Sequence, residues 1–407
     1  MADPARRWRT PDLWRISFSA FFADLGYQAV LALFPLYLVL HLGAPVWVFG
    51  LSQALAYGPG ALFGYWGGRL GDRYGRRKIA LIGNAFLPLL ALIGLAGVPW
   101  LAVLLLAAGW WARNLRSPPR RALVTETVPA ADHGSAFGFL HALDVGGGML
   151  AAVYAFLLLE GGVPYRDILL GTALPLVVST AVLWGVRVGR SPPAPETAAP
   201  PASRTTSTPG AGAARGLVGA ILAATLLYGF ASYSIGFPVL STAQTTGVPA
   251  FGVLVFIVFL GVSAVVGLAI GGIRGGRVRL LGLGGYGLAS VGSVLLALGA
   301  AGFGGLAAFL SGAALLGAAL GTVETFEPTL LARVVPSDRR SREFGRLTAF
   351  RSVGLFVANL VLGLLFVVNP AYPYLYASVA AGAAALLIVA WLPRIGAAGD
   401  APRDRSG

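Results

Sequence analysis

The sequence predicts an all-α integral membrane protein whose twelve transmembrane helices form two pseudo-symmetric six-helix bundles. Three observations lead to this prediction: an apolar composition, long uncharged runs and an internal repeat. Of the 407 residues, 57% are hydrophobic and only 11% are charged, and the mean hydropathy is +0.77. This balance lies far from that of a soluble domain. A spanning β-barrel is excluded because its short strands would alternate apolar and polar positions.

Each predicted span is a run of roughly 20 residues with little or no charge, which is enough to cross about 30 Å of hydrocarbon as a helix. The first run is too long to be the core of a cleavable signal peptide, so we expect it to serve as a signal anchor. Only a Gly-rich turn near Gly302 separates the ninth and tenth runs. The twelve runs cover residues 13–41, 46–67, 79–97, 99–118, 135–159, 165–187, 217–240, 250–272, 279–301, 303–326, 344–368 and 371–392.

The basic residues fall on one side of the membrane if the chain alternates between its two faces. The opposite loops hold only Arg166, beside Asp167. The positive-inside rule then places both termini in the cytoplasm and agrees with an even number of spans in the cell's inner (plasma) membrane. The formal charge of +14 therefore reports topology and not nucleic-acid binding. The basic clusters lie at residues 6–15, 69–78, 113–121, 187–215, 274–279, 333–346 and 394–405.

Several chemistries are excluded by residues that the chain lacks. It has no cysteine, which removes disulfides, thiol catalysis and Cys-based metal sites. His41, His133 and His141 are scattered without metal-ligand spacing. No nucleophile with a base and no phosphate-binding Walker loop is found. We therefore expect neither an enzyme nor a cofactor, a metal or an ATP-driven pump.

A Pro-, Ala-, Ser- and Thr-rich stretch at residues 189–216 divides the spans six and six. Its lack of periodicity predicts a flexible cytoplasmic linker between an N-terminal bundle (1–188) and a C-terminal bundle with its tail (217–407). Across the linker, residues 123–147 share a frame with 330–354. Such duplicated bundles are typical of transporters, which rock around a site at the membrane midplane. The alternative is a duplication that serves only as a stable scaffold.

The loop between the second and third predicted spans reads "GRLGDRYGRRK" at residues 68–78. It resembles the signature of the major facilitator superfamily, and the number of spans, the duplication and the orientation fit that family as well. The resemblance implies its fold and transport by alternating access. The matching residues are Gly68, Leu70, Gly71, Asp72, Arg73, Gly75, Arg76 and Arg77.

The chemistry of this motif suits a cytoplasmic gate. Gly68 and Gly75 permit close backbone approach and a tight turn. Asp72 can accept hydrogen bonds from a helix N-terminus or from an arginine. In the family, the matching aspartate joins the two halves when the site faces outward, which implies the same role for Asp72. The motif's arginines have an alternative role as topological anchors.

Ionisable residues within spans are functional candidates because their burial in lipid is costly. Asp24 lies about ten residues into the first span and is the best candidate for substrate contact or proton coupling. A structural hydrogen bond to a neighbouring helix is the alternative. Gln28, one turn on, shares its helix face. Tyr228 and Ser232 occupy the equivalent positions of the seventh span.

A second group of candidates follows the fourth and fifth spans. The repeat aligns Arg120 with Glu327 and Asp144 with Arg351, so each half could hold one ion pair of reversed polarity, or the pairs could cross between the halves. Crossed pairs would act as a switch, whereas fixed pairs would offset burial. Arg113 is expected to be a partner of Asp72 or a neighbour of the proton site. His141, Glu324 and Asn359 are further cavity candidates.

The sequence here also resembles prokaryotic superfamily members with a basic, Pro-containing end to the fourth span, although Arg121 stands where an acidic residue is expected. We predict a monomeric secondary carrier whose partners are a small-molecule substrate, protons and the lipid bilayer, with efflux favoured over uptake. A uniporter or importer is the alternative within this class. A non-transporting receptor or assembly protein on the same fold is the alternative from another class.

Overall fold

The computed structural model describes residues 10–128, 133–188, 211–271, 280–334 and 340–399, and every regular element in these ranges is helical. Ten helical stretches there are long and apolar enough to cross a membrane. Two more helices, α2 and α4, have 29 residues each and are therefore about 44 Å long. Together they are consistent with the twelve predicted spans. The α-helices are α1 (Pro11–Pro35), α2 (Val46–Tyr74), α3 (Arg76–Ala85), α4 (Pro99–Thr127), α5 (His133–Glu160), α6 (Tyr165–Gly171), α7 (Ala173–Trp184), α8 (Ala211–Ala231), α9 (Gly236–Thr246), α10 (Pro249–Gly271), α11 (Leu288–Ala300), α12 (Gly305–Val334), α13 (Arg340–Val368) and α14 (Tyr372–Gly399).

Several spans change helix type along their length. After Pro35, the first span continues as the π-helical segment Leu36–His41. The third span passes from α3 into the 3₁₀ segment Leu87–Leu95, whose second residue is Pro88. A π-helical segment, Leu280–Gly287, precedes α11. Since proline lacks an N–H donor, it favours such changes in hydrogen-bond register.

The predicted seventh span, residues 217–240, is not one continuous helix. Helix α8 ends at Ala231, and α9 begins only at Gly236. The interruption falls in a Ser-Tyr-Ser stretch before Gly236 and Pro238, residues that favour a break over a continued α-helix. Helix α8 also starts at Ala211, inside the predicted linker. The rest of that linker, residues 189–210, and the tail from residue 400 lie outside the described residues.

Contacts divide the chain into two compact units. Among the described residues, the first unit contains residues 10–188 and 234–260. The second unit contains residues 211–233 and 261–399. Residues 234–260 thus pack with the first unit, although the sequence assigned them to the C-terminal bundle. The break before α9 permits this, and the ring of Phe237 lies 4.9 Å from that of Phe49. The duplicated bundles themselves stay a prediction.

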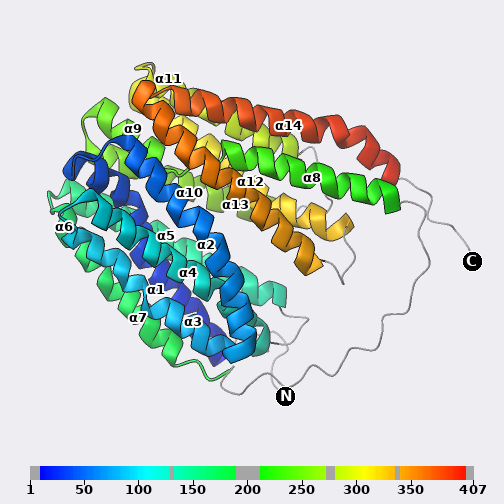
Figure 1. Ribbon diagram of the computed structural model, residues 1–407, viewed down its shortest axis with the longest axis horizontal. Coiled ribbons are helices and arrows are strands. Elements are labelled where there is room, and N and C mark those ends of the chain that lie inside the picture. Colours follow the sequence, from blue (N-terminus) through cyan, green and yellow to red (C-terminus); the bar gives the residue numbers. More distant parts are fainter. Residues whose placement is uncertain (1–9, 129–132, 189–210, 272–279, 335–339, 400–407) are drawn as a thin grey trace, which may run out of the picture. The chain divides into compact units, whose positions relative to one another are not determined.

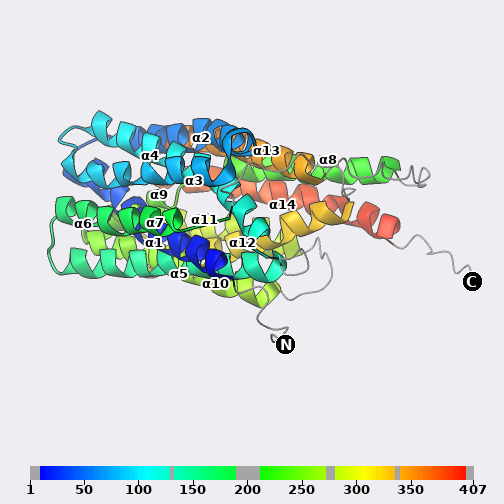
Figure 2. The same ribbon diagram turned by 90° about the horizontal axis from the view of Figure 1, so that it is seen from below.

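In the first unit, helix α1 packs against α5 and α7, and helix α4 packs against α2 and α3. Figures 1 and 2 show these helices running side by side. Helices α2 and α4 approach especially closely at Gly67, where an added Cβ would collide with the carbonyl oxygen of Leu115. This contact positions the charged end of α2 beside α4, and small residues at such crossings are typical of membrane helices.

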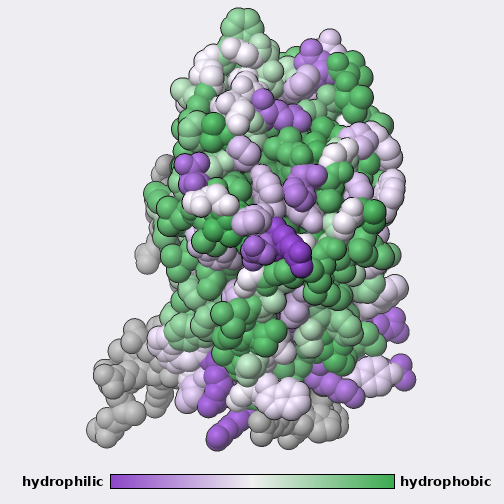
Figure 3. Space-filling model, turned by 90° about the vertical axis from the view of Figure 1, so that its left-hand side faces the viewer, coloured by the Kyte–Doolittle hydropathy of each residue, from purple (hydrophilic) through white to green (hydrophobic). Residues whose placement is uncertain are grey.

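In the second unit, helix α8 packs against α13 and α14, and α11 packs against α12 and α14. The buried side chains of Tyr286 and Phe326 belong to its apolar core. Many large apolar side chains of the protein are nevertheless exposed, including Leu268 and Val379. Figure 3 shows hydrophobic residues covering much of one face. Such an outer surface suits contact with lipid.

Candidate functional site

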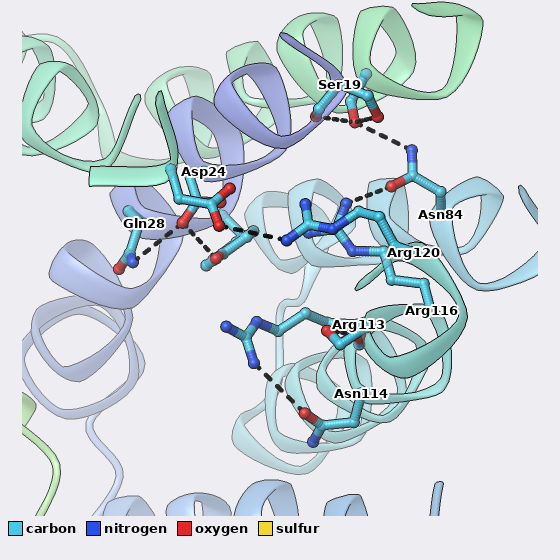
Figure 4. A network of polar contacts seen from close by, with 12 residues as sticks. Ser19, Asp24, Gln28, Asn84, Arg113, Asn114, Arg116 and Arg120 are labelled. Carbon is cyan, nitrogen blue, oxygen red and sulfur yellow. Dashed lines mark hydrogen bonds and ion pairs between the residues drawn. The ribbon is translucent and has the colours of Figure 1, made fainter. Parts of the chain in front are cut away.

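Asp24 is buried in the middle of α1, where two side chains of its own helix hydrogen-bond to it. Tyr27 donates its hydroxyl to Asp24 Oδ1, and Gln28 Nε2 lies 3.5 Å from the same oxygen. Figure 4 shows Asp24 and Gln28 on one face of the helix. The structure thus brings the predicted pair together. It adds Tyr27, which the sequence analysis missed although it lies three residues from Asp24 and therefore on the same helix face.

Helix α4 presents three arginines towards this region. Arg113, Arg116 and Arg120 are three and four residues apart, so one face of the helix carries all three. Arg120 Nη2 lies 3.3 Å from Asp144 Oδ2 on α5. Residue exposure is only 1% for Arg116 and 5% for Arg120. The fold therefore holds two guanidinium groups that are almost entirely buried.

Arg113 lies among aromatic rings. Its Cζ atom is 4.7 Å from the ring centroid of Trp110 and 5.4 Å from that of Tyr27. Trp110 in turn makes edge contacts with Tyr27, at 5.9 Å between centroids, and with Tyr57, at 5.3 Å. These distances permit cation–π interaction. Arg113 was expected either beside Asp72 or near Asp24. The structure places it near Asp24, because Tyr27 contacts both residues. Asp72 pairs with a different arginine.

Arg116 belongs to a polar chain that crosses four helices. It donates from Nη1 to Asn84 Oδ1 on α3. Asn84 Nδ2 then donates to Ser179 Oγ at 3.1 Å and Thr180 Oγ1 at 2.8 Å on α7. Ser179 Oγ also lies 3.1 Å from Ser19 Oγ on α1. The only signal of this chain in the sequence is the presence of single polar residues within apolar runs, which did not predict it.

The second unit holds a comparable cluster with the opposite excess of charge. Arg351 on α13 donates to Glu324 Oε1 at 2.5 Å and to Glu327 Oε2, both on α12. Tyr286 donates its hydroxyl to the other oxygen of Glu327. The ring of Tyr228 on α8 lies 4.7 Å from that of Tyr286. The predicted residues Tyr228, Glu324, Glu327 and Arg351 therefore lie together, so each unit contains its own ion pair.

Two predicted site residues lie apart from these clusters. His141 is exposed on α5, one turn before Asp144, and takes no part in the hydrogen-bonded network of the described residues. Asn359 is buried on α13, where Nδ2 donates to the carbonyl of Leu355 at 2.8 Å. This bond ties the amide to its own helix backbone.

The glycine- and arginine-rich motif is helical along most of its length and is not the loop expected from the sequence. Helix α2 runs to Tyr74, and α3 begins at Arg76. Only Gly75 separates them, with a φ angle of 100° that side chains rarely adopt, as the motif predicted. The other glycine differs from expectation. The closest helix approach lies at Gly67, whereas at Gly68 an added Cβ would meet its nearest atom, on Pro118, at an ordinary 3.7 Å.

The motif's charges form a small network in the first unit. Arg76 Nε lies 3.0 Å from Asp72 Oδ1, and Arg76 Nη1 lies 2.8 Å from Glu126 Oε1 on α4. The side chain of Asp72 is 67% exposed. Arg73 lies over the ring of Tyr74 at 5.2 Å, and Leu70 occupies the preceding turn of α2. Asp72 therefore accepts from an arginine, one of the two donors expected for it.

Metal binding finds no support in the part of the chain that is described. No group of three or more His, Asp or Glu side chains there could hold a metal ion. The charged clusters contain arginines instead, which repel cations. These clusters offer hydrogen-bonding groups and charges inside a membrane-embedded protein.

Comparison with known proteins relates this arrangement to a family. Residues 16–312 match the Major Facilitator Superfamily. A search of curated proteins finds no match. Among solved structures, a POT family transporter in complex with 5-aminolevulinic acid superposes with a TM-score of 0.76 at 13% identity, covering 94% of this chain and 96% of that one. The nucleoside transporter NupG gives 0.71 at 11% identity, with 94% and 99% covered.

A bacterial homolog of the human lysosomal transporter Spinster is similar as well, with a TM-score of 0.67, 12% identity and 98% of both chains covered. At these identities, the structural likeness shows the fold alone. The family match, however, spans well over half of the sequence. The chain is therefore a multi-pass, non-enzymatic membrane transporter that belongs to the Major Facilitator Superfamily.

Proposed function

We propose that this transporter is a proton-coupled secondary carrier in which Asp24 binds the coupling proton. The observation that carries the proposal is the difference between two neighbouring carboxylates. Asp144 forms an ion pair with Arg120. Asp24 accepts hydrogen bonds from the neutral groups of Tyr27 and Gln28, and the described residues offer it no ion pair. A buried carboxyl without a fixed counter-charge is suited to exchange its proton.

The surroundings of Asp24 supply the electrostatic link to a solute. Arg113, Arg120 and Asp144 all interact electrostatically with it. Protonating Asp24 therefore changes the balance of charge next to the arginines of α4. A solute that binds there would respond to the proton, and alternation of access would convert that response into coupled flux.

Three finer features complete the proposal. Asp72, with Arg76 and Glu126, would form the cytoplasmic gate, as the motif's resemblance implies. Both termini would lie in the cytoplasm of a cell's inner membrane, as the positions of the basic residues suggest. Efflux is favoured over uptake on the breadth of the superfamily alone. The first solutes to test are 5-aminolevulinic acid, small peptides and nucleosides, which the related structures suggest.

The decisive experiment uses purified protein in liposomes with an imposed pH gradient. Flux of a solute from that panel should follow the gradient in the natural protein. In Asp24→Asn, which keeps a hydrogen-bond acceptor but cannot ionise, the dependence on the gradient should disappear. Asp167→Asn is the matched control, because it removes the same carboxylate from an exposed position outside the cluster and leaves Asp24 in place.

Each outcome of this experiment has a distinct meaning. Gradient-dependent flux that persists in Asp24→Asn would remove Asp24 from coupling. Flux of the natural protein that ignores the gradient would favour a uniporter. Thermal unfolding of both variants shows whether a loss of flux reflects loss of the fold. Exchange of labelled solute without a gradient shows whether Asp24→Asn still translocates it.

A further inference from the structure

We propose that the arginines of α4 bind an anionic group of the transported solute, a carboxylate or a phosphate. This proposal rests on the carrier function proposed above and specifies the chemical class of its substrate. The binding group would lie beside Arg113 and Arg120, on the face of α4 that is directed towards Asp24 (Figure 4). Three observations support the assignment.

The first observation is the balance of charge. Arg113, Arg116 and Arg120 carry three positive charges, and Asp24 and Asp144 carry two negative charges, which leaves an excess of one even when both carboxylates are ionised. Of these three arginines, only Arg120 is paired with an acid among the described residues. Arg116 has a neutral amide as its partner. A buried charge without a counterion is costly, and a bound anion would offset that cost.

The second observation is an excess of unused donor atoms. Within the described structure, the buried atoms Arg113 Nε, Arg116 Nε, Arg120 Nε and Arg120 Nη1 have no hydrogen-bond partner. Among the buried atoms of this cluster in the described structure, the only acceptor without a partner is Asp144 Oδ1. Buried donors are normally satisfied. Oxyanions match arginine best because each oxygen accepts from a separate N–H group.

The third observation is the contrast with the second unit, which serves as an internal comparison. There, Arg351 has two carboxylates, Glu324 and Glu327, and Tyr286 satisfies Glu327 further. Arg351 leaves a single buried donor, Nε, without a partner. The repeat-equivalent ion pair is thus complete in the second unit and incomplete in the first. The anion is therefore assigned to the α4 cluster.

Access and surroundings favour a small organic anion. The Asp144 side chain is 26% exposed, so the cluster is not sealed. Arg113 and Gln28 are also partly exposed. Trp110 and Tyr27 lie buried beside Arg113, and the partly exposed ring of Tyr57, which contacts Trp110, offers apolar contact near the charge. A solute with an anionic group and an apolar body fits these neighbours.

The test compares four probes that share one ring and differ in the attached group: benzoate, phenyl phosphate, benzamide and benzylamine. Thermal unfolding of the full-length protein in detergent is followed against probe concentration at constant ionic strength. Binding to the folded state raises the unfolding midpoint and yields a dissociation constant. We expect benzoate or phenyl phosphate to stabilise the protein, and benzamide and benzylamine to have little effect.

Variants then locate the site. Arg113→Gln removes a charge that forms no ion pair and should weaken anion binding by about tenfold. The double variant Arg120→Gln, Asp144→Asn removes the ion pair without altering net charge, and should weaken binding likewise. Arg166→Gln removes the same charge from an exposed position elsewhere and should bind the anion as the natural protein does. Unfolding without probe shows that each variant is folded.

The four probes also separate the sources of the anion. Tighter binding of benzoate indicates a carboxylate-bearing solute, and tighter binding of phenyl phosphate indicates a phosphate ester. The proposal is overturned if neither anion stabilises the protein, if benzamide or benzylamine does so equally well, or if Arg113→Gln and the double variant both leave anion binding unchanged. Because binding in detergent requires no gradient, these results are independent of the flux experiment on Asp24.

Discussion

Arg120 on α4 and Asp144 on α5 form an ion pair with 3.3 Å between Nη2 and Oδ2. The equivalent pair of the second unit joins Glu327 on α12 to Arg351 on α13, with the signs exchanged. The positions that the predicted repeat aligns therefore hold opposite charges. Each pair forms within one unit, and each offsets the burial of its own charges.

A double-mutant cycle measures the strength of the first pair. Arg120→Gln and Asp144→Asn should each lower the free energy of unfolding by about 2–3 kcal/mol, because each leaves one partly buried charge without its partner. The double variant should lose less than the sum of these values, by about 1–3 kcal/mol. Strictly additive losses would contradict the pairing. The cycle on Arg76 and Glu126, which are more exposed, should give a coupling of only about 0.5 kcal/mol.

The two acids beside Arg351 should differ sharply in their effect on stability. Glu327 is fully buried, whereas the Glu324 side chain is 57% exposed. Glu327→Gln should therefore lower the free energy of unfolding by about 2–4 kcal/mol, and Glu324→Gln by less than about 1 kcal/mol. Chemical unfolding in detergent measures both. Equal effects would show that burial does not determine the contribution of these carboxylates.

The glycines of α2 offer a test of helix packing between adjacent positions. Gly67→Ala should destabilise the protein by about 1–3 kcal/mol, because the added methyl group collides with the backbone of α4 at Leu115. Gly68→Ala is the matched control, since its nearest new contact lies at 3.7 Å. It should be neutral or slightly stabilising because alanine favours the helix. A control variant as unstable as Gly67→Ala would argue against this packing.

The gate proposed for the motif should affect transport more than stability. Asp72 is 67% exposed and pairs with Arg76 only one turn away on the surface. Asp72→Asn should therefore change the unfolding midpoint little, while it slows solute flux in liposomes. Asp167→Asn removes a carboxylate from an exposed position outside the motif and serves as the comparison, with flux equal to that of the natural protein. Unaltered flux in Asp72→Asn would leave the motif with a topological role alone.

The sequence predicted the membrane helices and the residues of two clusters, because lipid forces charge to be rare within spans. Asp24, Arg120 and Asp144 stood out for that reason, and the repeat aligned the last two with Glu327 and Arg351. Tyr27 and the polar chain through Asn84 could not be recognised, because single polar residues are common in spans. Whether such residues bond to one another depends on which helices are in contact. The break between α8 and α9 was missed because its local signals, Gly236 and Pro238, stand inside a run that is apolar enough to span as one helix. The helical continuation of α2 was missed because glycines and charges favour a loop in the sequence, whereas packing against α4 stabilises the helix.

The absence of cysteine allows a direct test of the predicted orientation. Any cysteine introduced into this chain is the only one present. Lys78 at the start of α3 and Arg166 at the start of α6 are both exposed, and the positive-inside rule places them on opposite sides. A maleimide that cannot cross membranes should label Arg166→Cys in intact cells, and should label Lys78→Cys only after the membrane is opened. Labelling in the reverse pattern would place the basic clusters outside and both termini with them, which would contradict the charge-based topology.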